Sequence, residues 1–419
     1  MRRIFLVLGV VAALLTVAAV VNRPARTAPV AAAARIDPLV VRVARAQQHL
    51  RDVPGDWAGW AGLGAAYLEQ ARVTSDPALY PQAEQAARRS LALRRNGDAL
   101  VVLGALANAR HDFAAARDQA KAALAADVND GEAYGVLADA LTQLGDAPGA
   151  TDAVQHMLDT RPGLAAYARA SYDLELRGKL TEAENLMRRA LTDAVDPHDA
   201  AFCRTQLGDL AFGRGDLRSA GDEYAAALTA DPSAVAALRG RARIRAAQGD
   251  LPGALADYAD LTARLPGPGY LIEYAELLNL DSRADAAAEQ LALAGAAQQL
   301  FTANGGQDGL ATAALALATG RPADAVTAAR AEWARRHHPD VADTLAWSLH
   351  AAGQDVEALS FAKLAGGRPA NYAYHLGVIQ LSLGHTAEAR AELTRALATN
   401  PYFSPADAPN ARRALGGLR

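Results

Sequence analysis

The chain has 419 residues, more than one compact core usually holds, and its formal net charge of −4 argues against a nucleic-acid-binding protein. Hydrophobic residues make up 51% of the sequence but aromatic residues only 5%, so alanine supplies much of the apolar content and favours closely packed helices. The single cysteine, Cys203, excludes an internal disulfide and a multi-cysteine metal site, and its place in a predicted helix indicates a buried structural thiol.

Residues 1–21 have the pattern of an N-terminal membrane anchor or signal segment. Arg2 and Arg3 precede an uncharged apolar run, Ile4–Val21, which is close to the minimum length that spans a bilayer. Alanine-rich cleavage motifs occur only well beyond this run, so we expect a retained single-pass anchor, with a cleaved secretory signal as the alternative. Long segments after an anchor cross the membrane regardless of nearby charge. This favours an extracytoplasmic location for the rest of the chain, and a cytoplasmic orientation is the alternative.

The next two segments connect this run to the main part of the chain. Residues 22–35, which are rich in alanine, are interpreted as a linker. Residues 36–56 predict an N-terminal capping helix, because Asp37 is a good N-cap residue and Pro38 suits the first helical position. Pro54 ends this segment, since proline cannot continue a helix.

The stretch from residue 376 to residue 401 contains one complete helix hairpin. Apolar residues recur at helical spacing on both sides of Gly384, which is expected to supply the positive φ of a helix C-terminus. Pro401 stops the second helix. The small residues Gly377, Ala389 and Ala396 are expected where the two helices approach each other closely.

The same scheme recurs along the chain and identifies a repeat. Residues Trp60–Tyr67 match W-x2-L-G-x2-Y, the first-helix pattern of the tetratricopeptide repeat. Turn glycines, spaced alanines and prolines then recur in phase, and several copies are about 34 residues apart, the period of that family. An inserted loop is expected at residues 72–80. The inferred copies begin at residues 57, 97, 131, 164, 201, 235, 268, 306, 339 and 370.

Residues 57–401 therefore resemble the tetratricopeptide family. The resemblance implies an all-α solenoid, a right-handed superhelix of about ten helix hairpins whose stacking makes one continuous core. Residues 402–419 are then expected to form a C-terminal capping segment over the apolar edge of the last copy. Three stretches also resemble a group of actinobacterial envelope-associated tetratricopeptide proteins. They are Glu332–Arg336, Val341–His350 and Asn400–Pro405. This resemblance implies the class of protein but no mechanism.

The family resemblance places the first helix of each copy on a concave wall, where a partner would bind. Tryptophan and tyrosine are enriched in binding hot spots, so their presence near the end of this wall favours recognition there. Two plainer interpretations stay open: polar residues on the wall for solubility alone, and a core position for Trp347. The candidate partner-binding residues are Arg239, Arg243, Asp343, Trp347, His350, Asn371 and Tyr374.

The sequence has no phosphate-binding loop and no H-E-x-x-H zinc motif, so we expect neither an enzyme nor a cofactor nor a metal site. The leading hypothesis is a membrane-anchored scaffold that binds a protein or peptide partner through its concave surface, and no nucleic acid. Convergence of His350 and His375 near Asp343 leaves one alternative of another class. This alternative is a small-ligand or metal-handling accessory protein of an envelope enzyme or transporter.

Overall fold

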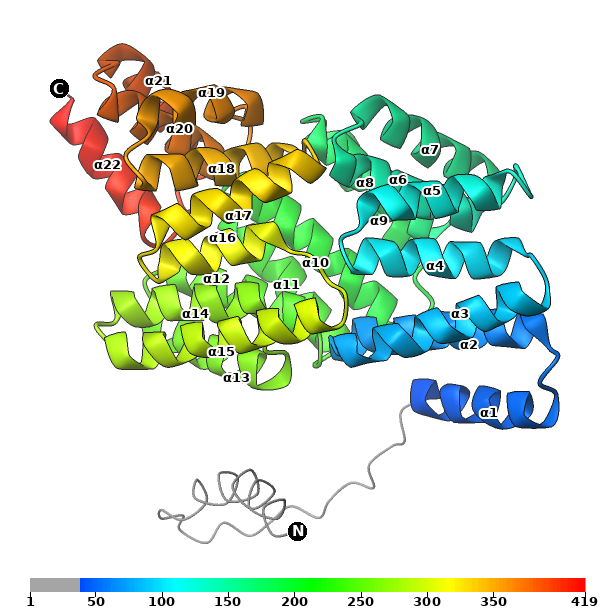
Figure 1. Ribbon diagram of the computed structural model, residues 1–419. Helices are drawn as coiled ribbons and strands as arrows, with labels where there is room; N and C mark the ends of the chain where they lie inside the picture. Colours follow the sequence, from blue (N-terminus) through cyan, green and yellow to red (C-terminus); the bar gives the residue numbers. More distant parts are fainter. Residues whose placement is uncertain (1–37, 419) are drawn as a thin grey trace, which may run out of the picture.

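The computed structural model describes residues 38–418, and this part of the chain consists of helices and connecting loops without a strand (Figure 1). The predicted anchor at residues 1–21 and the linker at residues 22–35 lie outside the described residues. None of the described helices is long and apolar enough to cross a bilayer.

Ten helix hairpins follow one another, as predicted, and form an all-α solenoid whose hairpins are numbered here as copies 1 to 10. Helix α1 (Pro38–Asp52) precedes them, α22 (Asp407–Gly417) follows them, and the 3-10 helix η1 (Pro77–Leu79) lies inside copy 1. The hairpins are α2 (Trp57–Thr74) with α3 (Tyr80–Leu93), α4 (Gly97–Ala109) with α5 (Phe113–Leu124), α6 (Gly131–Leu144) with α7 (Ala147–Thr160), α8 (Leu164–Leu176) with α9 (Leu180–Thr192), α10 (Pro197–Gly213) with α11 (Leu217–Ala230), α12 (Val235–Ala247) with α13 (Leu251–Arg264), α14 (Pro268–Leu280) with α15 (Ala284–Ala303), α16 (Gly309–Ala318) with α17 (Pro322–Arg335), α18 (Pro339–Ala351) with α19 (Asp355–Ala365), and α20 (Ala370–Ser382) with α21 (Thr386–Thr399).

The first helices begin at the predicted residues in all but two copies. Copy 5 begins at Pro197 rather than at residue 201, because Asp196 accepts a hydrogen bond from the backbone N–H of Asp199 and caps an earlier start. Copy 8 begins at Gly309 rather than at residue 306, because Asp308 caps the helix in the same way. The predicted loop at residues 72–80 is shorter than expected, since α2 continues to Thr74 and η1 occupies its middle.

Every hairpin turn contains one residue with positive φ, the conformation that glycine adopts most easily. Gly384 has φ of 77°, as predicted. His111, in copy 2, takes the same position with φ of 60°, although its side chain makes that conformation costly. The residues at this position in the other copies are Ser75, Gly145, Gly178, Gly215, Gly249, Ser282, Gly320 and Gly353.

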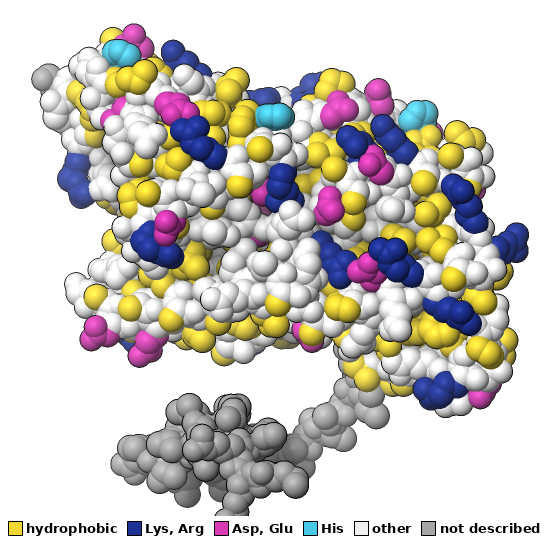
Figure 2. Space-filling view, viewed as in Figure 1, with side chains coloured by type: hydrophobic (Ala, Val, Ile, Leu, Met, Phe, Trp, Pro, Cys, Tyr) yellow, Lys and Arg dark blue, Asp and Glu magenta, His cyan; other side chains and the backbone are white. Residues whose placement is uncertain are grey.

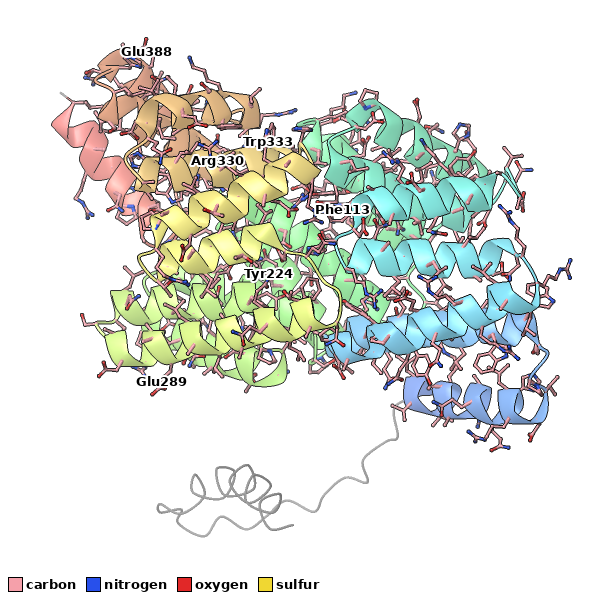
Figure 3. All side chains as sticks on the ribbon, viewed as in Figure 1. Phe113, Tyr224, Glu289, Arg330, Trp333 and Glu388 are labelled. Atoms are coloured by element: carbon pink, nitrogen blue, oxygen red, sulfur yellow. The ribbon has the colours of Figure 1, made fainter. Side chains whose placement is uncertain are left out.

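Small residues allow close contact within and between copies. Ala389 and Ala396 are fully buried, and a Cβ atom added to Gly377 would lie 2.9 Å from Leu393 Cγ, as the sequence predicted. Tyr224, labelled in Figure 3, fills the junction between copies 5 and 6. A Cβ atom on Gly240 would lie 2.4 Å from Tyr224 Cζ, so the aromatic ring occupies the space that this glycine leaves.

The first helices of successive copies contact one another, for example α2 with α4 and α16 with α18, and they line the inner side of the superhelix. The superhelix also returns to touch itself. Turns of copies 2 to 5 lie against the loops that follow copies 7 to 10, always five copies further along. We call this line of contact the seam. Figure 1 shows the early copies, in blue and cyan, beside the later copies, in yellow and orange.

Backbone hydrogen bonds join the two sides of the seam. The N–H of Gln307 donates to the carbonyl oxygen of Arg110 at 2.9 Å, and Arg110 Nε donates to the carbonyl oxygen of Asn304 at 3.0 Å. One copy further on, the N–H of His337 donates to the carbonyl oxygen of Leu144 at 3.3 Å. These contacts give the backbone groups of the turns hydrogen-bond partners that water would otherwise supply.

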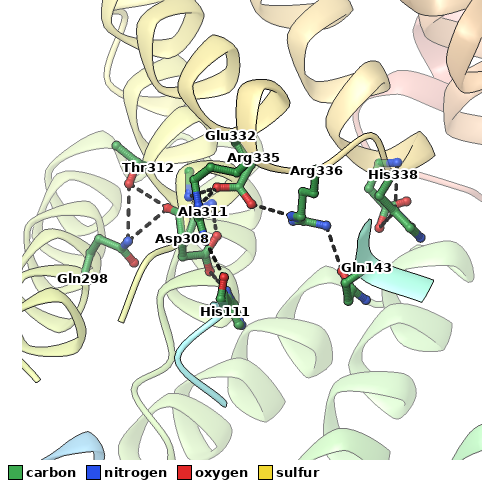
Figure 4. A network of polar contacts seen from close by, with 12 residues as sticks. His111, Gln143, Gln298, Asp308, Ala311, Thr312, Glu332, Arg335, Arg336 and His338 are labelled. Carbon is green, nitrogen blue, oxygen red and sulfur yellow. Dashed lines mark hydrogen bonds and ion pairs between the residues drawn. The ribbon is translucent and has the colours of Figure 1, made fainter. Parts of the chain in front are cut away.

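A buried ion pair lies in the middle of the seam (Figure 4). The Glu332 carboxylate, with an exposed fraction of 1%, accepts from Arg336 and from Arg335, the latter at 2.7 Å. Arg336 also donates to Gln143 Oε1 at 2.7 Å across the seam, and its guanidinium lies 5.2 Å from the centre of the Phe113 ring. The ion pair itself is thus made within one side of the seam, and the hydrogen bond to Gln143 and the Phe113 ring connect it to the other side.

The outer surface in view carries charges of both signs. Figure 2 shows basic and acidic side chains interspersed over this face, without an extended patch of one sign.

Candidate partner-binding site

Two arginines of α12 face the inner side of the superhelix. Arg239 and Arg243 are four residues apart and share one face of the helix. Arg241 and Arg245 lie on another face, where both form ion pairs with Asp257 of α13, at 2.6 and 3.0 Å. The helical period thus divides four closely spaced arginines into a structural pair and an inner pair.

Arg239 is held by the next copy. Its Nε donates to Glu273 Oε2 of α14 at 2.7 Å, and a second guanidinium nitrogen donates to the other carboxylate oxygen. The Tyr258 hydroxyl donates to the same Glu273 oxygen at 2.7 Å. Burial alone would raise the pKa of Glu273, but the Arg239 guanidinium outweighs burial and holds that pKa below its ordinary value. Glu273 therefore stays ionised and fixes Arg239.

Arg243 is held less firmly. Its guanidinium carbon lies 4.0 Å from the centre of the Phe212 ring, and its ion pair with Asp209 is 3.9 Å long, beyond hydrogen-bond distance. Because stacking leaves the edge of the guanidinium free to donate, Arg243 retains capacity for a further acceptor.

The two arginines line a cavity of about 280 Å³, called here the inner cavity. Asn371, at the start of α20, lines it from the other side. Three of the seven predicted site residues, from copies 6 and 10, thus meet in one place. The other lining residues are Ala246, Tyr258, Glu273, Glu276, Leu277, Phe403, Ser404 and Pro405.

The inner cavity also contains a carboxyl group that titrates near neutrality. Burial raises the pKa of Glu276 to about 7, and the neighbouring carboxylates of Asp407 and Glu273 add to the rise. Below this pH the Glu276 carboxyl is protonated and can donate a hydrogen bond. Above it, the group is a second negative charge beside Glu273.

Four other predicted residues form a ring cluster on α18 and α20. The Trp347 ring stacks on His375 with centroids 4.2 Å apart and on His350 with centroids 5.0 Å apart. His375 Nδ1 lies 2.9 Å from the Asp343 carboxylate. Tyr374 is next to Trp347, with ring centroids 6.0 Å apart.

Most of this ring cluster is internal, which corrects the expectation of an open aromatic wall. Asp343 and Tyr374 are each only 5% exposed, so neither presents a surface to a partner in this conformation. The physical reason is that Phe403, 5.5 Å from the Tyr374 ring, and α22 fold over the last copy. His350 lies near the C-terminal end of α18 and pairs with Asp355 across the turn. Of these four residues, Trp347 and His350 are half-buried.

The two histidines do not converge on Asp343, because His350 pairs with Asp355 instead. Within residues 38–418, no group of three or more His, Cys, Asp and Glu side chains could hold a metal ion. The metal-handling alternative therefore has no site in this part of the chain. Cys203 is buried, and burial raises the pKa of its thiol to about 11, which agrees with the predicted structural role.

Sequence reasoning missed Glu273, Tyr258 and the segment around Phe403. One signal for Glu273 was present, because it follows Arg239 by 34 residues and so lies one position beyond the residue equivalent to Arg239 in the next copy. No comparable signal places Phe403 against copies 6 and 7, since that contact depends on how the whole superhelix curves.

No protein-family model matches the chain, and no curated protein matches it. Solved structures with a similar fold include a tetratricopeptide repeat protein from Parabacteroides merdae, with 17% identity, a TM-score of 0.36 and coverage of 61% of this chain and 98% of that one. Yeast Tom70 has 14% identity, a TM-score of 0.42 and coverage of 87% of this chain and 88% of its own. The Cut9 and Hcn1 hetero-tetramer of APC/C has 14% identity, a TM-score of 0.42 and coverage of 91% and 93%.

Proposed function

We propose that this protein is a tetratricopeptide scaffold that binds a protein partner on the inner side of its superhelix. The observation that carries the proposal is the inner cavity, where Arg239, Arg243 and Asn371 meet from copies far apart in the sequence. A cavity that mixes an aromatic ring, an incompletely paired arginine and an amide suits recognition of a polypeptide.

The dimensions of the inner cavity favour an extended segment over a helix. An α-helix with its side chains is about 10–12 Å across, too wide for a cavity of about 280 Å³. One or two side chains of an extended peptide fit this volume, while the peptide backbone can accept hydrogen bonds from Arg243 and Asn371. Trp347 and His350 then belong to the same inner side but not to the cavity.

We also propose that residues 4–21 anchor this scaffold to a membrane and that the copies lie outside the cytoplasm. The uncharged apolar run supports the anchor. A reporter enzyme fused after Arg419, active on only one side of the membrane, tests the orientation. Activity on the cytoplasmic side would overturn this part of the proposal without affecting the binding site. A small-ligand accessory role is less favoured, because no described residue group offers it a metal.

A photo-cross-linking amino acid placed at Asn371 tests the binding site in intact cells. Asn371 is exposed and lines the inner cavity, so we expect a discrete adduct with one partner. The matched control is Val356 on α19, which is 78% exposed but lies on a second helix. Arg243→Glu should remove the adduct formed at position 371. Equal adducts at positions 371 and 356, or an adduct insensitive to Arg243→Glu, would overturn the proposal.

A further inference from the structure

The inner cavity is lined by four charged side chains, and only two of them neutralise each other. Arg239 and Glu273 form the hydrogen-bonded ion pair described above. Arg243 and Glu276, both among the described residues, line the same cavity without forming an ion pair with each other. The lining therefore has a formal charge of zero, which consists of one closed ion pair and two separate charges of opposite sign.

The carboxyl group of Glu276 lies among other negative charges. Burial raises its pKa to about 7, and the carboxylates of Asp407 and Glu273 add to the rise. The Ser404 hydroxyl acts in the opposite direction, but it also donates to Asp407 at 3.2 Å. No lysine, arginine or histidine within residues 38–418 forms an ion pair with Glu276. A positive charge that enters the cavity would therefore favour the ionised form of this carboxyl group.

Arg243 carries the opposite charge and also lacks a close partner. The Asp209 oxygen that lies 3.9 Å away already accepts from the Tyr224 hydroxyl at 2.7 Å. The Phe212 ring covers one face of the guanidinium, so the guanidinium edge is left for an acceptor in the cavity. A carboxylate matches this edge best, because it can accept two parallel hydrogen bonds from a guanidinium.

The size of the inner cavity limits the distance between two charges on one ligand. A volume of about 280 Å³ corresponds to a space about 8 Å across, and side chains two residues apart on an extended segment lie about 7 Å apart on the same side. An acidic and a basic side chain at this spacing can therefore reach Arg243 and Glu276 at the same time. A lysine ammonium suits this small space better than a guanidinium, because it is compact and its three donors can rotate.

We propose that the inner cavity recognises a dipolar pair on the partner, consisting of an acidic residue bound by Arg243 and a lysine two positions away bound by Glu276. This inference rests on the proposed function and names the chemistry of the partner segment. Binding gives each unpaired charge of the cavity a counterion. A partner with only one of the two charges leaves the other cavity group buried without one, so the cavity discriminates against it.

Short peptides with blocked termini test the inference by fluorescence anisotropy with full-length protein. The dipolar peptides contain Asp-Ala-Lys or the reverse order, Lys-Ala-Asp, and the single-charge controls contain Asn-Ala-Lys or Asp-Ala-Gln. At pH 8 we expect one of the two dipolar orders to bind at least about tenfold more tightly than either single-charge peptide.

Two variants assign each charge of the peptide to its residue. Glu276→Gln should lower the affinity for the dipolar peptide to that for Asp-Ala-Gln and leave the affinity for Asp-Ala-Gln unchanged. Arg243→Gln should lower the affinity for the dipolar peptide to that for Asn-Ala-Lys. The matched controls are Glu289→Gln on α15 and Arg218→Gln on α11, two exposed changes that should bind all peptides like the wild type. Circular dichroism checks that each variant is folded.

The pH dependence of the wild type tests the lysine contact without any substitution. Glu276 is ionised above pH of about 7, so the dipolar peptide should bind about five- to tenfold more tightly at pH 8 than at pH 6. Asp-Ala-Gln, which has no lysine, should show a smaller change over the same range. Glu276→Gln should remove the difference between the two peptides.

Equal affinities for the dipolar and single-charge peptides, or a discrimination that Glu276→Gln leaves unchanged, would overturn the inference. Failure of the folded wild type to bind any of the peptides would overturn it as well. An adduct at Asn371 that Arg243→Glu still removes would in these cases leave the proposed function standing. Discrimination among the peptides without any adduct at Asn371 in cells would instead contradict the proposed function alone.

Discussion

The junctions between neighbouring copies are formed by apolar contacts, whereas the seam is formed by polar ones. Neighbouring helices meet through alanine and glycine, as at Ala83, Ala116 and Ala220, which are fully buried. The seam is closed by hydrogen bonds to backbone groups and by the hydrogen bond from Arg336 to Gln143. The first kind of contact is apolar and joins each copy to the next, whereas the second is polar and joins copies 2 to 5 to copies 7 to 10. The comparison teaches that the hydrophobic effect holds each copy against the next, while polar groups hold together turns and loops from copies far apart in the sequence.

Removing a large side chain from a junction between neighbouring copies should have the largest effect on the free energy of unfolding. Tyr224→Ala empties the space between Gly208 and Gly240 and leaves Asp209 without its hydroxyl donor, so we expect a loss of about 4 kcal/mol in the free energy of unfolding. Urea unfolding followed by circular dichroism measures it. Val195→Ala, at a side chain 96% exposed, is the control and should change stability by less than about 0.5 kcal/mol. A loss below about 1 kcal/mol for Tyr224→Ala would contradict this assignment of the junction.

Breaking the seam ion pair should have a slightly smaller effect. Glu332→Ala leaves Arg336 buried without its carboxylate, and we expect a loss of about 3 kcal/mol by the same measurement. The double variant Glu332→Leu with Arg336→Met removes both charges and should recover most of this loss. If the double variant is as unstable as the sum of the single variants, the seam depends on packing rather than on paired charges.

The buried hydrogen bond of Asn400, which follows copy 10, should contribute less to the free energy of unfolding. Asn400→Ala removes one buried hydrogen bond to the carbonyl oxygen of Phe212 and should cost about 1–2 kcal/mol. Asn129→Ala, in an exposed loop, provides the reference and should be neutral. Equal stability of the two variants would mean that the seam does not reach copy 5.

The smallest expected effect is a pH dependence of the seam. Burial lowers the pKa of His111 and of His338 below the ordinary value, so folding favours their neutral forms. Their contribution is present above pH of about 6.5 and is lost as the pH falls, because the unfolded chain then binds more protons. The groups that face His111 are Asp308, Glu332, Arg335 and Arg336, and those that face His338 are Asp340 and Arg336.

Urea midpoints at pH 7.5 and pH 5.5 measure this dependence. The variant His111→Gln with His338→Gln should lose less stability between the two pH values than the wild type does. Glu276, whose raised pKa acts in the opposite direction, is present in both proteins and cancels in the comparison. An identical pH slope in the two proteins would exclude the histidines as its source.

The sequence predicts the neighbour junctions because they repeat. Turn glycines such as Gly384 and buried alanines such as Ala389 recur in phase, and this was sufficient to count the hairpins and place most of their starts. The family resemblance led us to expect Arg239 and Arg243 on the inner side, and both line the inner cavity. The seam depends on the rotation accumulated over five copies, which the sequence of a single copy does not reveal. The one local sequence signal for the seam was His111, which stands at a turn position that glycine occupies in most copies.

The five-copy offset of the seam changes the order in which such a chain can fold. A linear array of copies can grow from either end, because each copy needs only its neighbour. Here seam bonds join residues 188 to 224 positions apart, so they must form after both halves exist. During synthesis, the turns of copies 2 to 5 therefore wait uncovered until copies 7 to 10 have left the ribosome. Truncation of the last copies would accordingly affect the middle of the molecule, because the turns that these copies cover would become exposed to water.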